Sequence, residues 1–374
     1  MTVPILDLQA QYRTLRPEIE AAVREVLESG QFILGPNVTA LEQELAGYLQ
    51  VARAVGLASG TDALHLAIRA CGVEAGEAVL TTPFTFVATA SPVSYVGARP
   101  VFADIRPDTF TLDPDRVGEV LAGRGPGGRT PARIRALIPV HLYGQAVDMD
   151  PLQALAKQHG LRVIEDAAQA IGAEYRGKRV GGLGDVGCFS FYPTKNLGAF
   201  GDAGMATTMD GELGARIAHL RVYATRGRYV HDDLGYNSRL DEIQAAILRV
   251  KLRWLDRWTA RRREIAARYR SGLAGLGVVL PAERPDGVHV YHQFAIRVPD
   301  RDGVQQRLNG RGVRTAVYYP LPLHLQPMYR DLGYREGGFP EAERAAREVL
   351  CLPMYPELTD GQVDEVVDAL KASV

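Results

Sequence analysis

Cysteine is scarce in this sequence and gives no sign of a disulfide framework or a metal site. Three cysteines, Cys71, Cys188 and Cys351, are spread over 374 residues, an odd number that forms no CxxC pair. The eight histidines show neither HxxxH nor HExxH spacing. The sequence therefore predicts no structural zinc, no disulfide framework and no metal in its site. Because all three cysteines stand in apolar surroundings, we expect buried, reduced thiols.

Long apolar runs and an excess of charge of one sign are missing too. No run approaches the roughly 18 residues that a membrane-spanning helix needs, and residues 1–7 contain no basic region followed by a hydrophobic stretch. The formal net charge is −1, which gives no global attraction to nucleic acid or to an anionic membrane. We therefore expect a cytoplasmic protein without a membrane or nucleic-acid partner.

The composition is that of an ordinary globular protein, with 46% hydrophobic and 23% charged residues. The length suggests roughly two domains. Near-continuous apolar strands that alternate with helices indicate a mostly parallel sheet covered on both faces, and hence an α/β fold. Such runs alternate with helical patterns at residues 54–58, 78–82, 100–104, 136–141, 163–164 and 189–191.

The rest of the chain predicts a second, smaller domain. A long helical pattern with basic faces covers residues 240–270, and we interpret it as a link between domains rather than a nucleic-acid element. A strand at residues 291–298 and helices at 304–308, 342–349 and 361–370 follow. We place a large domain at residues 1–250, whose N-terminal residues can pack on the other domain, and a small one at 251–374. The Gly-, Pro- and Arg-rich residues 124–133 predict an exposed loop, with a phosphate-binding loop as the alternative.

One lysine stands in an unusual place. Lys195 follows the aromatic run 189–192 and Pro193, whereas most lysines are solvated surface charges. Asp166 lies 29 positions earlier (195 − 166), at the end of another apolar run, where ligands of open α/β sheets bind. Pyridoxal phosphate (PLP) needs an amine for its aldehyde and a carboxylate for its ring nitrogen. Lys195, as covalent anchor and proton shuttle, and Asp166 are therefore the candidate catalytic pair.

Two further features are candidates for holding the phosphate of that cofactor. Residues 59–62, Ser-Gly-Thr-Asp, stand between a strand and a helix, where glycine lets an anion approach the N–H groups at the positive helix end. A structural helix cap is the commoner use of such residues, so both interpretations stay open. Ser190, on the run that leads to Lys195, adds a hydroxyl donor.

Ordered blocks along nearly the whole chain resemble the DegT-type sugar-nucleotide aminotransferases, which are fold-type I PLP enzymes. The blocks are residues 35–36, 59–64, 83–89, 139–144, 165–170, 189–198, 235–241 and 320–327. The resemblance implies a large, mostly parallel sheet domain sandwiched by helices, a smaller α+β C-terminal domain and PLP as cofactor. It also implies transfer of an amino group from L-glutamate to a keto group of a nucleotide-linked sugar, by a homodimer with shared active sites.

The same resemblance assigns roles to single residues. Lys195 would bind the cofactor covalently, Asp166 would face the pyridine nitrogen and Gln169 would lie near the ring hydroxyl. Phe86 would stack on the ring. Gly60, Thr61 and Ser190 would hold the phosphate, which Asn237 would reach from the neighbouring subunit. Without the resemblance, Phe86 reads as a core aromatic and Asn237 as a turn residue.

The substrate is indicated by smaller features. Residues 196–202 and 229–232 resemble enzymes that act on dTDP-3-keto-6-deoxyhexoses. Tyr318, where many relatives have histidine, is similar to enzymes that aminate UDP-linked 3-keto uronates. Both are 3-keto sugars, so we expect amination at C3 rather than C4. The candidate substrate contacts are Arg228, Tyr229, His231, Tyr318 and His324. For the first three, a solvated loop is the alternative interpretation. For His324, the alternative is a hydrogen-bonded structural histidine.

Other outcomes of the same chemistry stay open. They are a 4-keto sugar aminotransferase, a PLP-dependent sugar dehydratase, an amino-acid aminotransferase and a catalytically idle ligand-binding regulator. Some relatives that dehydrate their sugar carry histidine in place of the lysine. Lys195 therefore favours transamination.

Overall fold

The computed structural model describes residues 2–126 and 133–374. Most of the Gly-rich stretch 124–133 lies outside the described residues, so neither interpretation of it is tested.

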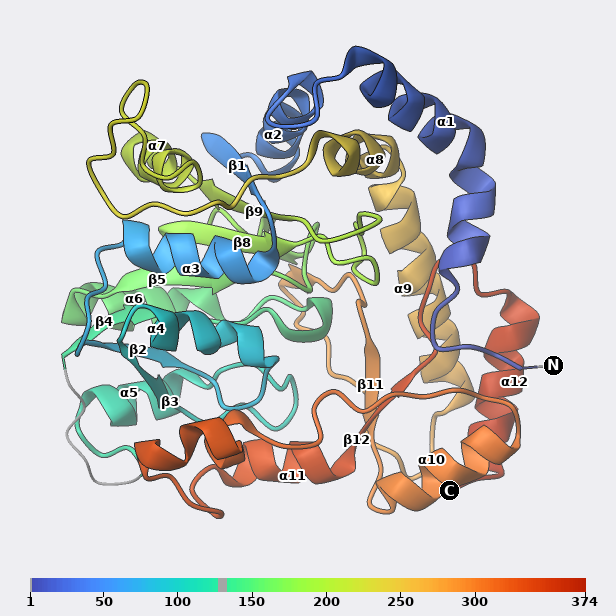
Figure 1. The fold of residues 1–374 in the computed structure, drawn as a ribbon. Coiled ribbons are helices and arrows are strands. Elements are labelled where there is room, and N and C mark those ends of the chain that lie inside the picture. Colours follow the sequence, from blue (N-terminus) through green and yellow to red (C-terminus); the bar gives the residue numbers. More distant parts are fainter. Residues whose placement is uncertain (1, 127–132) are drawn as a thin grey trace.

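A seven-stranded sheet forms the centre of the large part of the molecule (Figure 1), with the order β1-β9-β8-β5-β4-β2-β3. Strands β8, β5, β4, β2 and β3 run parallel, whereas β9 pairs antiparallel with both β1 and β8. The predicted α/β fold with a mostly parallel sheet is confirmed. The strands are β1 (Arg53–Leu57), β2 (Ala78–Thr81), β3 (Arg99–Phe102), β4 (Ile134–Leu137), β5 (Arg162–Asp166), β8 (Val186–Ser190) and β9 (Gly204–Thr208).

Helices cover both faces of this sheet because its strands are apolar on both sides. One hydrophobic cluster joins the sheet to α2, α5, α6 and α8, and a second joins it to α3, α4 and α7. Their bounds are α2 (Pro36–Leu49), α3 (Gly60–Ala70), α4 (Ser91–Tyr95), α5 (Pro114–Leu121), α6 (Met149–His159), α7 (Gly211–Leu220) and α8 (Glu242–Leu252).

The long helical pattern at 240–270 is two helices rather than one. It breaks at Arg253 and Trp254, between α8 and α9 (Leu255–Gly272). No proline or glycine marks the break in the sequence. Helix α8 packs against α1 (Leu8–Ser29) and α2, whereas α9 runs away from the sheet toward the C-terminal helices (Figure 1).

A second core lies at the other end of α9. There β11 (Phe294–Arg297) and β12 (Val349–Leu352) form an antiparallel pair covered by α9, α10 (Arg301–Gly310) and α12 (Asp360–Lys371). Val3 is buried in this core and bridges to Val313. Helix α11 (Pro340–Glu348) instead joins a cluster that contains Phe84 and Phe102 of the large part. The boundary at residue 250 stays a prediction.

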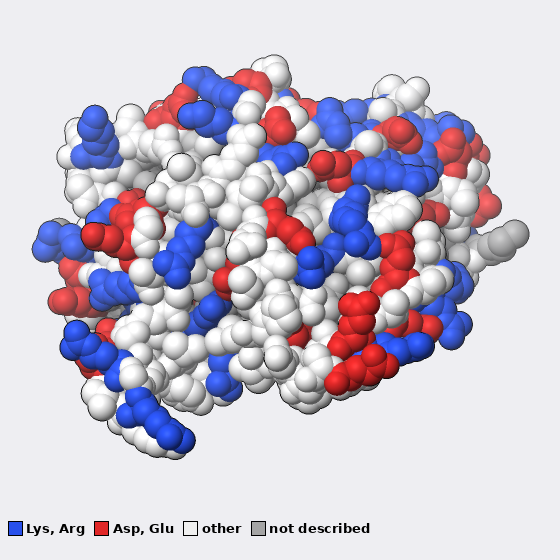
Figure 2. Space-filling model, turned by 90° about the horizontal axis from the view of Figure 1, so that it is seen from above, with Lys and Arg blue, Asp and Glu red and all other residues white. Residues whose placement is uncertain are grey.

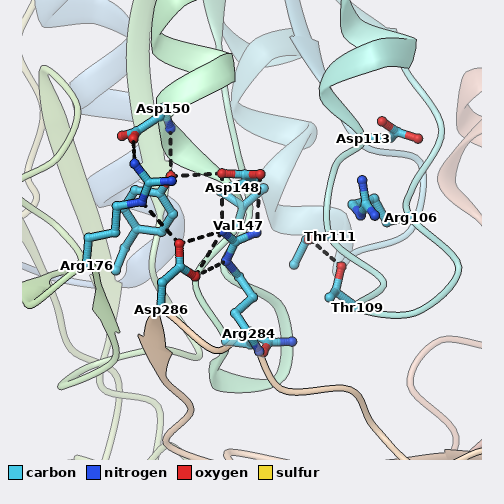
Figure 3. Close-up of polar contacts among 12 residues, drawn as sticks. Arg106, Thr109, Thr111, Asp113, Val147, Asp148, Asp150, Arg176, Arg284 and Asp286 are labelled. Atoms are coloured by element: carbon cyan, nitrogen blue, oxygen red, sulfur yellow. Dashed lines mark hydrogen bonds and ion pairs between the residues drawn. The ribbon is translucent and has the colours of Figure 1, made fainter.

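Between α9 and β11, the chain returns to the large part along residues 281–293, here called the returning segment. Its strand β10 (Gly287–Val288) pairs with β6 (Glu174–Tyr175), which also pairs with β7 (Lys178–Arg179). Ion pairs hold it beside the start of α6 (Figure 3): Arg284 contacts Asp148 at 3.3 Å, and Arg176 contacts Asp286 at 3.1 Å. The segment ends with His292 and Gln293, which line a cavity at the carboxyl ends of β5 and β8.

The formal net charge of −1 reflects nearly equal numbers of basic and acidic residues. On the face seen in Figure 2, positive and negative side chains are interspersed. Cys71, Cys188 and Cys351 are buried and free, which confirms the expected reduced thiols. Within residues 2–126 and 133–374, no helix has the length and apolar character that a membrane crossing requires. In the same part of the chain, no cluster of three or more His, Cys, Asp or Glu side chains is arranged to hold a metal ion.

Candidate active site

A cavity of about 540 Å³ opens at the carboxyl ends of β5 and β8. Ligands of open α/β sheets bind at this edge. The cavity wall includes most of the predicted cofactor residues, namely Gly60, Thr61, Phe86, Asp166, Gln169, Ser190 and Lys195, and also Tyr318 of the predicted substrate contacts.

Lys195 is presented by a tight loop directly after β8. The Lys195 N–H donates to the Tyr192 carbonyl at 2.8 Å, and a Cβ on Gly198 would lie 2.3 Å from the Pro193 carbonyl oxygen. The buried ammonium of Lys251 on α8 donates to the Gly198 carbonyl and so ties this loop to α8. Burial lowers the pKa of the Lys195 amine to about 8, although the Asp166 charge acts in the opposite direction. A neutral amine, the nucleophilic form, is thus accessible near neutral pH.

Asp166 is the last residue of β5, and its carboxylate is held by two hydrogen bonds. The Thr89 hydroxyl donates to Oδ2 at 2.6 Å, and the Ala168 N–H donates to Oδ1 at 3.2 Å. Asp166 pairs in register with Cys188 of β8, which sets its distance from the Lys195 loop. The carboxylate is 5% exposed, so its free lone pairs face the cavity and not bulk water.

A second, fully buried carboxylate lies behind Asp166. Glu165 accepts the Leu183 and Gly184 N–H groups on Oε1, and the Gly181 N–H and His141 Nε2 on Oε2, at 2.7–2.9 Å. His141 Nδ1 accepts the Val147 N–H, so Nε2 carries the ring proton. Glu165 therefore ties the loop at residues 181–184 and the segment of His141 to the end of β5.

The N-terminus of α3 and Ser190 form one concave surface. Ser59 caps the helix by accepting the Asp62 N–H at 3.1 Å, which confirms the capping interpretation for that residue. Gly60 lies so close to β8 that a Cβ there would be 2.6 Å from Ser190 Cβ. The free N–H groups of the first helical turn and the Ser190 hydroxyl therefore converge, as an anion site requires.

Gln169, Phe86 and Tyr319 also line the cavity. Gln169 accepts the Tyr143 N–H at 2.7 Å and donates from Nε2 to the Tyr319 hydroxyl at 3.0 Å. The Phe86 ring is 54% exposed and lies 6.0 Å from the Tyr319 ring. Burial raises the pKa of Tyr319, so its hydroxyl stays a proton donor. An open aromatic face and a polar corner thus meet in the cavity.

Other predicted residues lie away from this cavity. Asn237 is exposed and bridges to Val222. Arg228, Tyr229 and His231 belong to an exposed loop in which Tyr229 is 84% exposed. His324 is buried and contacts Glu343 through Nε2 at 3.0 Å, the arrangement of a structural histidine. Within one chain, the structure does not bring these five residues to the site, and their roles stay predictions.

Thr89, Tyr319 and His292 are among the residues of the cavity wall that sequence reasoning missed. His292 Nδ1 contacts Asn196 Oδ1 at 3.2 Å, and Asn196 Nδ2 donates to the Val290 carbonyl. The residue after Lys195 is thereby tied to the returning segment. Burial, with the Lys195 charge second, holds the pKa of His292 well below its ordinary value. Thr89 belongs to a matched motif and Tyr319 directly precedes one, so the sequence carried a signal for both, whereas His292 had none.

Known proteins resemble this chain over nearly its whole length. A relative from Geobacillus stearothermophilus, named pleiotropic regulatory protein, is 51% identical over 99% of this chain and 98% of its own length. A dTDP-3-amino-3,4,6-trideoxy-alpha-D-glucose transaminase from Streptomyces venezuelae is 48% identical (99% and 95%). A UDP-N-acetyl-3-dehydro-alpha-D-glucosamine 3-aminotransferase from Acidithiobacillus ferrooxidans is 46% identical (100% and 98%).

Solved structures agree with these relatives. Streptomyces venezuelae DesV in complex with a ketimine intermediate superposes with a TM-score of 0.94 at 47% identity, covering 99% of this chain and 98% of that one. Bacillus subtilis NtdA with bound cofactor PMP gives 0.90 at 33% identity, covering 100% and 85%. A sequence model of the DegT/DnrJ/EryC1/StrS aminotransferase family matches residues 13–371, and the chain belongs to that family.

Proposed function

We propose that this enzyme transfers an amino group from L-glutamate to the C3 keto group of a nucleotide-linked hexose, with PLP as its cofactor. The observation that carries the proposal is the convergence of Lys195 and Asp166 in one cavity at the carboxyl ends of adjacent strands. A family of aminotransferases and relatives named for 3-amino sugars support both the reaction type and the position.

The residues present fit PLP. The space at Gly60, which a Cβ would fill, and the Ser190 hydroxyl suit a phosphate. Asp166 suits a protonated ring nitrogen, and Phe86 offers an aromatic face. Gln169 already uses Oε1 and one N–H but keeps a second amide proton for a ring oxygen. When bound, PLP supplies an electron sink that stabilises negative charge at the substrate carbon.

The chain's own groups then perform binding and proton transfer. Lys195 Nζ, with its pKa lowered to about 8, can exist as the free amine and can both take up and return a proton within the cavity. The Asp166 carboxylate would keep a proton on the ring nitrogen of bound PLP. The Tyr319 hydroxyl accepts a hydrogen bond from Gln169 Nε2, so its own proton is available to a group bound in the cavity.

We also propose a homodimer in which Asn237 and the loop with Arg228, Tyr229 and His231 serve the neighbouring subunit's cavity. Among the described residues that line the cavity, Lys195 is the only lysine or arginine. A phosphate, a sugar diphosphate and the carboxylates of glutamate need more positive charge than one chain supplies. The exposed Arg226 and Arg228 are available for that role, and the exposed Asn237 can add an uncharged amide donor. Buried free thiols support a cytoplasmic location.

The deciding experiment uses the purified protein with PLP. Excess L-glutamate is expected to bleach the yellow absorption band and release 2-oxoglutarate. Addition of a dTDP- or UDP-linked 3-keto hexose should restore the band and yield the 3-amino sugar, identified by mass spectrometry and NMR. Colour that is indifferent to glutamate, or a dehydrated sugar product, would contradict the proposal. Comparison of 3-keto with 4-keto substrates tests the position.

A further inference from the structure

A chain of hydroxyl groups leads to Asp166 from the segment after β2. Thr85 Oγ1 lies 2.9 Å from Thr89 Oγ1, and Thr89 Oγ1 lies 2.6 Å from Asp166 Oδ2. Thr89 closes the short helical turn η1 (Val87–Thr89). Thr85 is 3% exposed, Thr89 is 1% exposed and Asp166 is 5% exposed, so bulk water does not compete for these bonds.

Counting protons fixes the direction of the chain. A threonine hydroxyl has a single proton, and an ionised carboxylate has none to give. Thr89 must therefore donate to Asp166, which leaves Thr89 only as an acceptor toward Thr85. Thr85 in turn donates to Thr89. Both protons point toward the carboxylate, so each hydroxyl polarises the next and the final bond is charge-assisted.

We infer that Thr89, supported by Thr85, is a positioning residue that holds Asp166 Oδ2 in place and stabilises the ionised carboxylate. The inference rests on the proposed PLP chemistry, because Asp166 there must stay ionised beside a protonated ring nitrogen. Hydrogen bonds to the charged form of a carboxylate favour that form. Of the two protein hydrogen bonds to the Asp166 carboxylate, the Thr89 bond is much the shorter, at 2.6 Å against 3.2 Å from Ala168.

The hydroxyl can be separated from the packing of the side chain. Thr89→Val keeps the shape of the buried residue but removes the donor, and Thr89→Ser keeps the donor but removes the methyl group. Thr85→Val removes only the second link. Thr81→Val is the matched control, because Thr81 is fully buried and donates to the Ile138 carbonyl at 2.8 Å outside the cavity.

The test is the nitrogen-15 NMR shift of ring-labelled PLP bound to each variant, together with kcat and KM. In Thr89→Val we expect the shift to move toward that of unprotonated pyridine and kcat to fall about ten- to a hundredfold, as expected for the loss of one hydrogen bond to a charged group. Thr85→Val should move both in the same direction by less. Thr89→Ser and Thr81→Val should keep the wild-type shift.

Two results would overturn the inference. One is a Thr89→Val protein that binds PLP with the wild-type shift and rate. The other is a Thr89→Ser protein as impaired as Thr89→Val, since packing would then be the cause. Thermal unfolding without PLP checks that each variant folds. Failure of the wild-type protein to bind PLP at all would instead refute the proposed function, so the two failures are distinguishable.

Discussion

Asp166 and Lys195 reach one cavity from the carboxyl ends of adjacent parallel strands, and the Asp166 charge opposes the effect of burial on the Lys195 amine. Burial dominates, so the pKa of the amine falls to about 8. The pair thus combines a carboxylate with an amine that gains and loses a proton near neutral pH.

Replacement of Lys195 by alanine should remove both the covalent attachment of PLP and the proton-transferring amine. We expect turnover to fall by about 10³-fold or more. The measurement is turnover together with the absorption band of the protein–PLP complex. Lys178→Ala, an exposed lysine on β7, is the control and should behave as wild type. Wild-type activity in Lys195→Ala would falsify the assignment.

The uptake of PLP by the cofactor-free protein should depend on pH through Lys195. Only the neutral amine reacts with an aldehyde. Because the pKa is lowered to about 8, the uptake rate should rise about tenfold per pH unit below pH 8 and level off above it. Stopped-flow absorption between pH 6 and 9.5 measures this.

The substitution Asp166→Asn tests the direction in which the Asp166 charge shifts the pKa of Lys195. Since the Asp166 charge raises the pKa of Lys195, its removal should move the inflection to lower pH. An inflection that stays fixed or moves to higher pH would show that the two groups do not interact as described.

Gly60→Ala should weaken PLP binding. The new Cβ would lie 2.6 Å from Ser190 Cβ, so either the helix start or Ser190 must shift out of the proposed phosphate site. We expect the Kd for PLP to rise by about tenfold or more, as for loss of one or two charge-assisted hydrogen bonds. Gly47→Ala on α2 has open space around it and should leave the Kd unchanged.

Glu165→Gln should destabilise the fold without touching the cavity. Each carboxylate oxygen of Glu165 accepts two N–H donors, so an amide group in either orientation places its NH₂ against two donors. The free energy of unfolding should fall by about 3 kcal/mol, measured by urea denaturation of the cofactor-free protein. Glu28→Gln, exposed on α1, should change it little.

Mixed dimers test the sharing of sites between subunits. Lys195→Ala and Asn237→Ala chains, inactive or weak alone, should regain activity when unfolded and refolded together. One intact site forms only in the mixed dimer, so about a quarter of the wild-type activity is expected. Activity no higher than that of the separate variants would mean that Asn237 does not serve the neighbouring subunit.

Local pattern predicted the elements that are buried on both sides. Residues 54–58, 78–82 and 189–191 fall on β1, β2 and β8 or directly beside them, since only a covered strand is apolar at consecutive positions. The strand predicted at 136–141 overlaps β4 (Ile134–Leu137) only at its first two residues. After Leu137 the chain stays extended, but it pairs with β5 only through the isolated bridge between Val140 and Asp166. The break between α8 and α9 has no local signal; packing of α8 on α1 and α2 decides it.

The sequence by itself determined the chemistry: a lysine and an aspartate at the ends of buried strands, a glycine at a helix start and the family to which they belong. These follow from residue type and order, which the chain carries locally. Only the tertiary structure decided which side chains support them. Thr89 meets Asp166 across 77 positions and His292 meets Asn196 across 96. Such contacts depend on strand order and on the path of the returning segment, and neither leaves a periodic trace in the sequence.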